Sequence, residues 1–330
     1  MQRGEGILRY QRVALVCVAA ILAIAGVIHL FSLNNRIAKL ESSVRDKDRQ
    51  IAALSKEHCS VFTEQKSSSN MVYTIKSSGG MRTYRVQTPA QYAYNTRMPM
   101  VILFSGKGAN GAILEQLADF STAPVISVYP EPLKGTDKAN SWQGAPYSPP
   151  KVSDVSFTRD IITKMSEDYC VDPAQIYTVG MSNGGGMAWL SACYLSDKVA
   201  ATATIAGAHY TDYQKCPTKR SPQGILAIHS RTDKQVPYEG DKKRGLPSLP
   251  TWAKTRALEN GCKKTPSHQI SRDFSIDTWS QCTGDTRVTL VSIGDQPHGW
   301  MKLPDVTTDP NLPNPNLSGY VWDFLRQYRR

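Results

Sequence analysis

The sequence predicts an α/β fold with a mostly parallel central sheet and helices on both faces, preceded by an N-terminal transmembrane helix and a short helical stalk. Short apolar runs alternate with segments of helical periodicity through most of the chain, a pattern typical of a parallel sheet covered on both sides. An uncharged apolar segment near the N-terminus predicts the membrane helix. About 260 residues remain after these segments, enough for one domain with a large core.

The N-terminal segment has no charged residue from Val13 through Phe31, and these 19 residues are enough to cross a bilayer as a helix. A cleaved signal peptide is the alternative, with Ala23-Ile24-Ala25 as its cleavage site. Cleavage there would leave an exposed apolar end, so we favour an uncleaved anchor. The predicted organisation is a tail over 1–12, a transmembrane signal-anchor over 13–33, a helical stalk over 34–67 and a globular domain over 68–330.

The predicted stalk carries apolar residues at heptad positions, namely Ile37, Leu40, Val44, Ile51 and Leu54. Lys47 interrupts this short series, which is therefore a weak coiled-coil signal. We favour a solvated spacer helix over a coiled coil. Lys and Arg flank the membrane segment on both sides, so the positive-inside rule does not orient it.

In the globular domain we expect a hairpin followed by alternating strands and helices. The hairpin joins 71–76 to 81–87 through Ser77-Ser78-Gly79-Gly80. Strands are predicted near 99–104, 124–129, 175–179, 200–205, 224–229 and 287–293, and helices near 155–169, 184–194, 251–260 and 317–328. Long loops at 130–152 and 236–250 are expected over the functional face, because loops of such length are more often functional than idle.

Residues 180–184 read Gly-Met-Ser-Asn-Gly and lie between a predicted strand and a predicted helix. In that context the G-x-S-x-G pattern is typical of a nucleophile elbow, a sharp turn that exposes the serine. Glycine suits positions 180 and 184 because a side chain at either one would crowd the backbone. Ser182 is therefore the candidate nucleophile. The alternative is a glycine-rich turn with an unreactive serine.

A serine hydroxyl is a poor nucleophile near neutral pH, so it needs a base, and the base needs an orienting acid. Asp233 and His298 each follow a predicted strand, in the chain order Ser, Asp, His. Either residue taken alone is better interpreted as a solvated loop residue. Together with Ser182 they predict a catalytic triad. His209 is the best competitor for the role of the base.

Acyl transfer also needs backbone N–H donors for the developing oxyanion. The residue after the nucleophile, Asn183, is predicted to supply one donor. Ser105-Gly106-Lys107-Gly108 follows a buried strand, so Lys107, or Gly106 beside it, is predicted to supply the second. A phosphate-binding loop is rejected for this segment because the G-x-x-x-x-G-K-[ST] spacing is absent.

From about Thr74 to Tyr328 the sequence resembles the secreted feruloyl-esterase and polyhydroxybutyrate-depolymerase family of α/β-hydrolases. The matching segments are Arg82–Pro89, Asp154–Phe157, Tyr169–Pro173, Gly180–Gly185, Ala192-Cys193, Ala206-Gly207, Asp233–Tyr238 and His298–Trp300. The resemblance implies an α/β-hydrolase fold, with Ser182 as nucleophile, His298 as general base and Asp233 as its orienting acid. It also implies that Trp300 and Trp142 line the substrate pocket, and that neither a metal nor another cofactor is needed.

The substrates implied by this resemblance are carboxylic esters: feruloyl or acetyl esters of polysaccharides, or short hydroxyalkanoate polyesters. One position departs from the family pattern, since Ser105 stands where a histidine usually precedes the glycine. The departure puts substrate preference in doubt, and activity to a lesser degree. Two alternatives to the esterase stay open. One is a catalytically impaired hydrolase-fold module that binds an anionic surface polymer, and the other is a serine peptidase, because the same triad serves both reactions.

Seven cysteines are present, and Cys17 lies in the predicted membrane segment. Proximity in sequence predicts the disulfides Cys193–Cys216 and Cys262–Cys282, and elimination leaves Cys59–Cys170. No C-x-x-C pair is present, so a zinc or thioredoxin-type site is not supported. Because disulfides persist in oxidising compartments, we expect an extracytoplasmic domain on a single-pass anchor, or a secreted protein after cleavage. Six reduced thiols in a cytosolic enzyme are the alternative.

The formal net charge is +11, and the basic residues are unevenly spread. Between Lys215 and Arg272, thirteen Lys or Arg stand against four Asp or Glu. An excess of this kind either attracts acidic polysaccharide or anionic lipid, or is a solvated basic face. Nucleic acid is not an expected partner because no recognised binding motif accompanies the charge.

Overall fold

The computed structural model describes residues 35–37, 39–40, 43, 71–92, 96–263, 267–271, 274–303 and 316–330, with the backbone alone for 267–271. The chain divides into two compact units, Met1–His58 and Cys59–Arg330. In the first unit, residues 35–37, 39–40 and 43 are helical, and Ile37 and Leu40 are exposed. The predicted membrane segment 13–33 and most of the predicted stalk lie outside the described residues. Among the residues that are described, no helix combines the length and the apolar character that a bilayer crossing requires.

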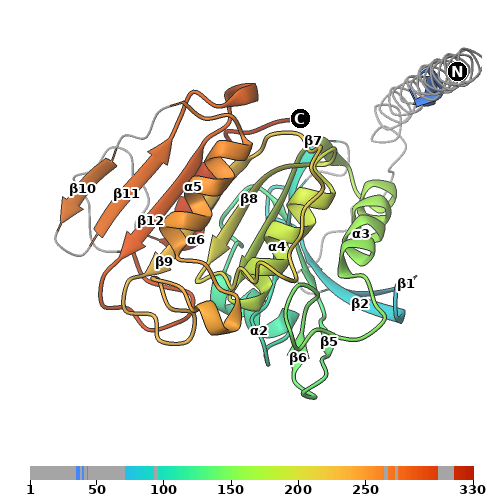
Figure 1. The fold of residues 1–330 in the computed structure, drawn as a ribbon. Helices are drawn as coiled ribbons and strands as arrows, with labels where there is room; N and C mark the ends of the chain where they lie inside the picture. The colour runs from blue at the N-terminus through green and yellow to red at the C-terminus, as the bar shows by residue number, and fades with distance from the viewer. Residues whose placement is uncertain are drawn as a thin grey trace, which may run out of the picture. The chain divides into compact units, whose positions relative to one another are not determined.

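One large sheet forms the centre of the second unit (Figure 1). Its strands in spatial order are β1 (Met71–Ser77), β2 (Gly80–Gln87), β4 (Ile126–Pro130), β3 (Met98–Phe104), β7 (Val171–Met181), β8 (Val199–Ile205), β9 (Gly224–Ser230), β12 (Val288–Ile293), β11 (Phe274–Trp279) and β10 (Ser267–Ser271). From β4 to β12 every neighbouring pair is parallel. The outer pairs on both sides are antiparallel. The prediction of a mostly parallel sheet is confirmed.

Strand β3 shows why the sheet is covered on both faces. Met100, Ile102 and Phe104 belong to one buried apolar cluster. Val101 and Leu103 belong to a second cluster on the opposite face. Successive side chains of a strand point to opposite faces, so a run without polar residues can only be buried on both sides.

Helices fill both faces, as expected from the alternation in the sequence. Helices α3 (Asp154–Asp168), α4 (Asn183–Tyr194) and α5 (Leu249–Glu259) contribute to the first cluster and lie across one face in Figure 1. Helices α2 (Gly111–Ala118) and α6 (Leu317–Leu325) contribute Leu114 and Val321 to the second cluster. In this arrangement α4 packs directly behind the strand that precedes the candidate nucleophile.

Several elements were not predicted from the sequence. Helix α2 follows the glycine-rich segment, where the Asn110 side chain caps it by accepting from the Ile113 N–H. Strands β10 and β11 extend the sheet beyond β12 as a hairpin. Within the predicted loop 130–152, the short strands β5 (Leu133–Lys134) and β6 (Asn140–Ser141) pair with each other. These are short or mixed-polarity segments, for which hydrophobic periodicity gives little signal.

A buried ion pair fixes the start of α3. The Arg82 guanidinium lies 2.8 Å from Asp154 Oδ1, and both side chains are fully buried. The same guanidinium lies 4.0 Å above the Phe157 ring centroid. The second carboxylate oxygen of Asp154 accepts a 2.7 Å hydrogen bond from the Gln143 backbone N–H. The pair therefore connects β2, α3 and the loop that precedes α3.

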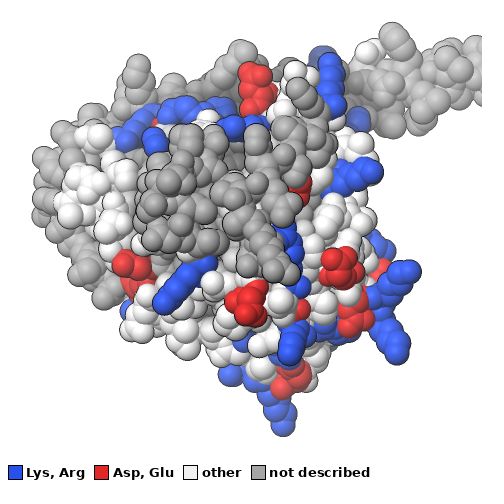
Figure 2. Space-filling model, turned by 90° about the vertical axis from the view of Figure 1, so that its left-hand side faces the viewer, with Lys and Arg blue, Asp and Glu red and all other residues white. Residues whose placement is uncertain are grey.

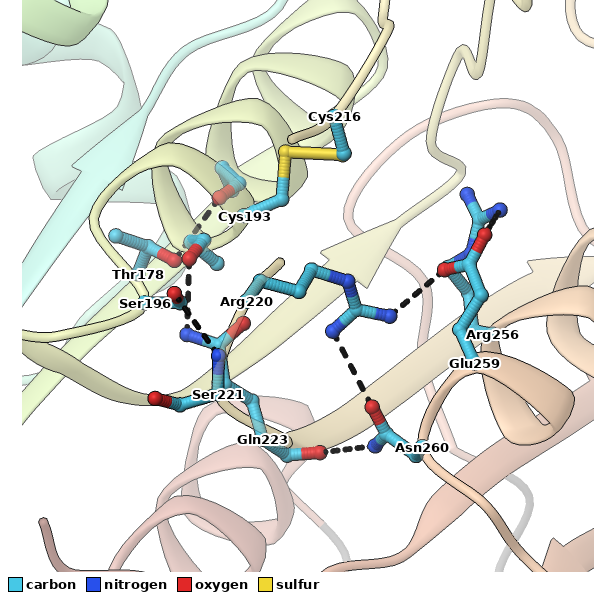
Figure 3. Close-up of a disulfide and its surroundings, with 12 residues drawn as sticks. Thr178, Cys193, Ser196, Cys216, Arg220, Ser221, Gln223, Arg256, Glu259 and Asn260 are labelled. Carbon is cyan, nitrogen blue, oxygen red and sulfur yellow. Dashed lines mark hydrogen bonds and ion pairs between the residues drawn. A yellow bond between two sulfur atoms is a disulfide. The ribbon is translucent and has the colours of Figure 1, made fainter. Parts of the chain in front are cut away.

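Two of the predicted disulfides are present, Cys193–Cys216 and Cys262–Cys282. Cys170 is also disulfide-bonded, whereas its predicted partner Cys59 lies outside the described residues. Figure 3 shows that the Cys193–Cys216 bridge joins α4 to the segment that leads to Arg220. Arg220 in turn donates hydrogen bonds to Glu259 and to Asn260 at the end of α5.

Part of the basic excess between residues 215 and 272 is paired. Arg220 and Arg256 both contact Glu259, and Arg244 contacts Asp241. On the face shown in Figure 2, acidic and basic side chains are interspersed over the described surface. These three arginines share two of the four acidic residues in this region, so the excess of basic over acidic residues remains.

Candidate active site

Ser182 occupies a strained turn between β7 and α4. Its backbone has φ 57° and ψ −122°, a combination that L-residues rarely adopt and that is found where a fold over-determines it. A Cβ at position 184 would collide with the carbonyl oxygens of Phe104 and Ser105, and a Cβ at position 180 would collide with the carbonyl of Gly184. The two glycines are thus required by the close approach of the backbone, as in a nucleophile elbow.

The structure brings together the three side chains predicted as a triad. His298 Nε2 lies 2.9 Å from Ser182 Oγ, and His298 Nδ1 lies 2.6 Å from Asp233 Oδ2. Asp233 follows β9 and His298 follows β12, so both arrive at the carboxyl edge of parallel strands, as Ser182 does. The Asp233 side chain is fully buried, and that of His298 is mostly buried.

Asp233 is held as a carboxylate. Burial alone would raise its pKa, but hydrogen bonds from His229, from His298 and from the Val236 backbone N–H outweigh burial and hold the pKa well below its ordinary value. Its other oxygen, Oδ1, accepts from the Gln235 and Val236 N–H groups at 2.8 and 2.9 Å. A carboxylate only accepts hydrogen bonds, so the proton of His298 is assigned to Nδ1. Nε2 is then left as an acceptor that faces the Ser182 hydroxyl.

The residues predicted to supply oxyanion donors lie close to Ser182. Asn183 begins α4, whose first-turn N–H groups have no partner within the helix. A Cβ on Gly106 would lie 3.5 Å from the Ser182 Cβ, so the 105–107 segment passes directly beside the nucleophile. The Lys107 ammonium lies 4.2 Å above the Tyr147 ring and 2.5 Å from Asp137, which fixes the side chain of this segment against the 130–152 loop.

Trp142, which the resemblance places in the substrate pocket, is fully buried in this structure. Its backbone N–H donates to Asn183 Oδ1 at 2.7 Å, and its indole N–H donates to the Ser105 carbonyl at 2.9 Å. Trp142 therefore supports both predicted oxyanion segments from beneath. Trp300, two residues after His298, is half-buried and packs against the second apolar cluster.

His209, the competitor for the base, is placed away from this role. It is buried and stacks on the Trp252 ring with a centroid separation of 3.8 Å. Within the described part of the chain neither ring nitrogen has a hydrogen-bond partner. Burial, reinforced by the nearby His229 and Arg256, holds the pKa of His209 well below its ordinary value, so the ring is neutral.

His229 is a site residue that sequence reasoning missed. It was read as part of its strand, which it is, but its Nε2 also lies 3.3 Å from Asp233 Oδ2. The spacing of four residues between His229 and Asp233, across the end of a strand, was the available signal. Among the described residues, no group of three or more His, Cys, Asp or Glu side chains is placed to hold a metal ion.

No protein-family model matches the chain. Feruloyl esterase B of Piromyces equi is 32% identical over 168 residues, which cover 44% of this chain and 30% of that protein. Feruloyl esterase D of Neurospora crassa is 28% identical over 165 residues, which cover 48% of this chain and 56% of that protein. The chain resembles the feruloyl esterases. The resemblance predicted from the sequence is thereby confirmed.

The similarity covers only part of each relative. The matched segments span less than two thirds of the length of both proteins. Feruloyl esterase C of Emericella nidulans is likewise 31% identical over 112 residues, which are 34% of this chain and 37% of that protein. An S-formylglutathione hydrolase structure from Agrobacterium tumefaciens superposes with a TM-score of 0.50 at 14% identity, covering 81% of this chain and 97% of the other. At that identity the likeness concerns the fold, which is that of an α/β-hydrolase.

Proposed function

We propose that this protein is a serine esterase that hydrolyses carboxylic esters through Ser182, His298 and Asp233. The observation that carries the proposal is the continuous series of hydrogen bonds from Ser182 Oγ through His298 to Asp233, with distances of 2.9 and 2.6 Å. It lies at a strained strand-to-helix turn, where a serine oxygen is exposed for attack. Similarity to feruloyl esterases supports an ester as the substrate.

In the proposed reaction, Ser182 Oγ attacks the ester carbonyl carbon while its proton passes to His298 Nε2. Asp233 stabilises the resulting imidazolium through Nδ1. His298 then gives the proton to the leaving alcohol oxygen, and an acyl-enzyme remains. Water repeats the sequence: its proton passes to His298, its oxygen attacks the acyl carbon, and the proton returns to Ser182 as the acid leaves.

The negative charge that develops on the carbonyl oxygen is proposed to be held by the backbone N–H groups of Asn183 and Lys107. Both lie on segments that contact Trp142, directly or through Ser105. Donors that are fixed before the reaction stabilise the transition state without reorganisation. Trp142 therefore supplies rigidity rather than substrate contact, and Trp300 remains the proposed pocket aromatic.

The Ser105 position bears on the alternative of an impaired binding module. The Ser105 carbonyl accepts a hydrogen bond from the Trp142 indole N–H. The segment is thus braced in a way that does not need a histidine side chain at position 105. This favours retained activity, with aromatic or short-chain acyl esters of polysaccharide as the proposed substrate class.

We also propose that the domain works outside the cytoplasm, tethered by the segment 13–33. Two disulfides in the second unit support an oxidising compartment. The uncharged run of 19 residues supports the tether. Labelling of surface-exposed chain in intact cells, before and after protease treatment, tests both parts of this proposal.

The esterase proposal is tested with p-nitrophenyl acetate and methyl ferulate on the full chain in mild detergent. Ser182→Ala is expected to lower kcat by roughly four to six orders of magnitude. Ser166→Ala is the matched control, since Ser166 lies on α3 and bonds only within its own helix. Folded wild-type protein that hydrolyses peptide substrates but neither of the two esters would favour the peptidase alternative.

A further inference from the structure

Two imidazoles meet the same carboxylate oxygen behind Ser182. Asp233 Oδ2 lies 2.6 Å from His298 Nδ1 and 3.3 Å from His229 Nε2. The His229 side chain is 1% exposed and the Asp233 side chain is not exposed at all, so no solvent competes for these contacts. The proposed reaction uses only one of the two histidines.

The proton of His229 is assigned by its second contact. His229 Nε2 lies 2.8 Å from the carbonyl oxygen of Val236, and a carbonyl oxygen only accepts hydrogen bonds. Nε2 therefore carries a hydrogen, which is donated to Val236 O, and the same nitrogen lies 3.3 Å from Asp233 Oδ2. The remaining ring nitrogen, Nδ1, is buried and has no partner within the described part of the chain.

Val236 closes this arrangement from the other side. Its backbone N–H donates to Asp233 Oδ1 at 2.9 Å, and its carbonyl accepts from His229. Val236 is thus hydrogen-bonded to both His229 and Asp233, and His229 Nε2 lies 3.3 Å from the carboxylate. The carboxylate accepts three hydrogen bonds, two on Oδ1 from the Gln235 and Val236 N–H groups and one on Oδ2 from His298. His229 Nε2 is a further close neighbour of Oδ2.

We propose that His229 is a positioning residue that acts through Asp233 and sets the lowest pH at which the site stays active. Its N–H withdraws negative charge from the oxygen that holds His298. With less charge on that oxygen, a protonated His298 is less strongly stabilised, so His298 is neutral and able to accept the serine proton at lower pH. The inference rests on the proposed function of the same site.

Other ionisable groups near this cluster are Tyr238, His209, Arg256 and Arg231, with Lys234 and Asp295 close in sequence to Asp233 and His298. Tyr238 lies with its ring centroid 6.2 Å from that of His229, and burial raises the pKa of Tyr238, so it is neutral. His209 is neutral for the reason given above, and Arg256 acts on His209 from α5. Arg231, after β9, donates to Ser275. None of these groups is substituted in the two His229 variants below.

The test compares two substitutions of His229. His229→Phe keeps a ring but has no donor, whereas His229→Gln keeps an N–H near the position of Nε2 and carries no charge at any pH. For the Phe variant, the acid limb of the kcat/KM profile is expected to move to higher pH by roughly half to one unit. The Gln variant is expected to keep the wild-type limb, and plateau kcat is expected to change about threefold or less in both.

A control separates this effect from repacking. His209→Phe alters a buried neighbour that makes no hydrogen bond to Asp233 and is expected to leave the acid limb in place. An unchanged limb in the His229→Phe variant, or an equal shift in the Gln and Phe variants, overturns the proposal. A lowered melting temperature with no movement of the limb means that His229 is structural only.

A second measurement does not depend on turnover. The Cε1–H resonance of His298 is followed by NMR as pH is lowered, in the wild type and in both variants. The Phe variant is expected to protonate at higher pH than the other two proteins, and coincident titrations contradict the inference. Absent hydrolysis with the expected NMR shift would instead refute the esterase proposal alone.

Discussion

The backbone N–H of Trp142 donates a 2.7 Å hydrogen bond to the side-chain oxygen of Asn183, 41 residues further along the chain. The same tryptophan holds the Ser105 carbonyl through its indole N–H. One buried residue of a long loop is thus bonded to both segments proposed to carry the oxyanion donors. We propose that the loop 130–152 positions these donors through Trp142.

Replacing Trp142 by Phe tests this role. The variant keeps an aromatic ring and the backbone bond to Asn183, but the Ser105 carbonyl loses its donor. We expect kcat for p-nitrophenyl acetate to fall about tenfold with little change in KM, because a loosened donor acts mainly on the transition state. Trp322→Phe on α6 is the control, and equal effects of the two substitutions would contradict the assignment.

The stability of the protein should depend on pH through His209. The pKa of His209 is lowered in the folded protein. Below about pH 6.5 the unfolded chain therefore binds a proton at this residue that the folded chain does not bind. Stability is therefore lost as pH falls from that value toward the folded pKa, by at most about 1.4 kcal/mol per pH unit. His209→Phe, which retains stacking on Trp252, should flatten urea-unfolding stability between pH 7.5 and 5. A variant with the same slope as the wild type would show that His209 is not the group responsible.

The free energy of unfolding should fall much more when one partner of the buried pair Arg82–Asp154 is replaced than when both are replaced. Asp154→Ala leaves a buried guanidinium and the Gln143 N–H without their partner, at an expected cost of about 3–5 kcal/mol in the free energy of unfolding. Arg82→Met combined with Asp154→Leu removes both charges and should recover much of that loss. A double-mutant cycle by urea unfolding measures this coupling. Additive losses would mean that the pair is not coupled.

The two disulfides offer a matched comparison. They close loops with sequence separations of 23 and 20 residues, so removal of either by a double Cys→Ala substitution should cost about 3 kcal/mol. Only Cys193–Cys216 joins α4 to the segment of Gln214, whose side chain donates to the Gly144 and Ala208 carbonyls near Ser182. Loss of that bridge should lower kcat several-fold at 25 °C, whereas loss of Cys262–Cys282 should leave kcat unchanged. Equal kcat values would contradict the link.

Much of the fold was predictable because its core strands are unambiguous. The run 98–104 has no polar residue, so only burial on both faces satisfies it. The juxtaposition of Ser182, Asp233 and His298 followed from placing each at the end of a parallel strand, since such ends meet at one edge of the sheet. The glycines at 180 and 184 indicated the turn, because a Cβ at position 180 would collide with the Gly184 carbonyl and one at position 184 with the Phe104 carbonyl.

What escaped prediction depended on contacts between distant segments. Trp142 in a loop rich in Pro and Gly reads equally as a pocket aromatic or as a buried support, and only its hydrogen bonds to Ser105 and Asn183 decide between them. His229 looked like an ordinary strand residue because the turn that brings Asp233 back beneath it has no periodic signal. Helix α2 is two turns long, too short for hydrophobic periodicity to reveal.

The most direct test of the account is covalent labelling of the native protein with a fluorophosphonate, mapped by peptide mass spectrometry. The account predicts a single label on Ser182, absent after Ser182→Ala and slowed by about three orders of magnitude or more after His298→Ala. A folded wild-type chain that takes no label, or that is labelled as fast without the His298 imidazole, would contradict it.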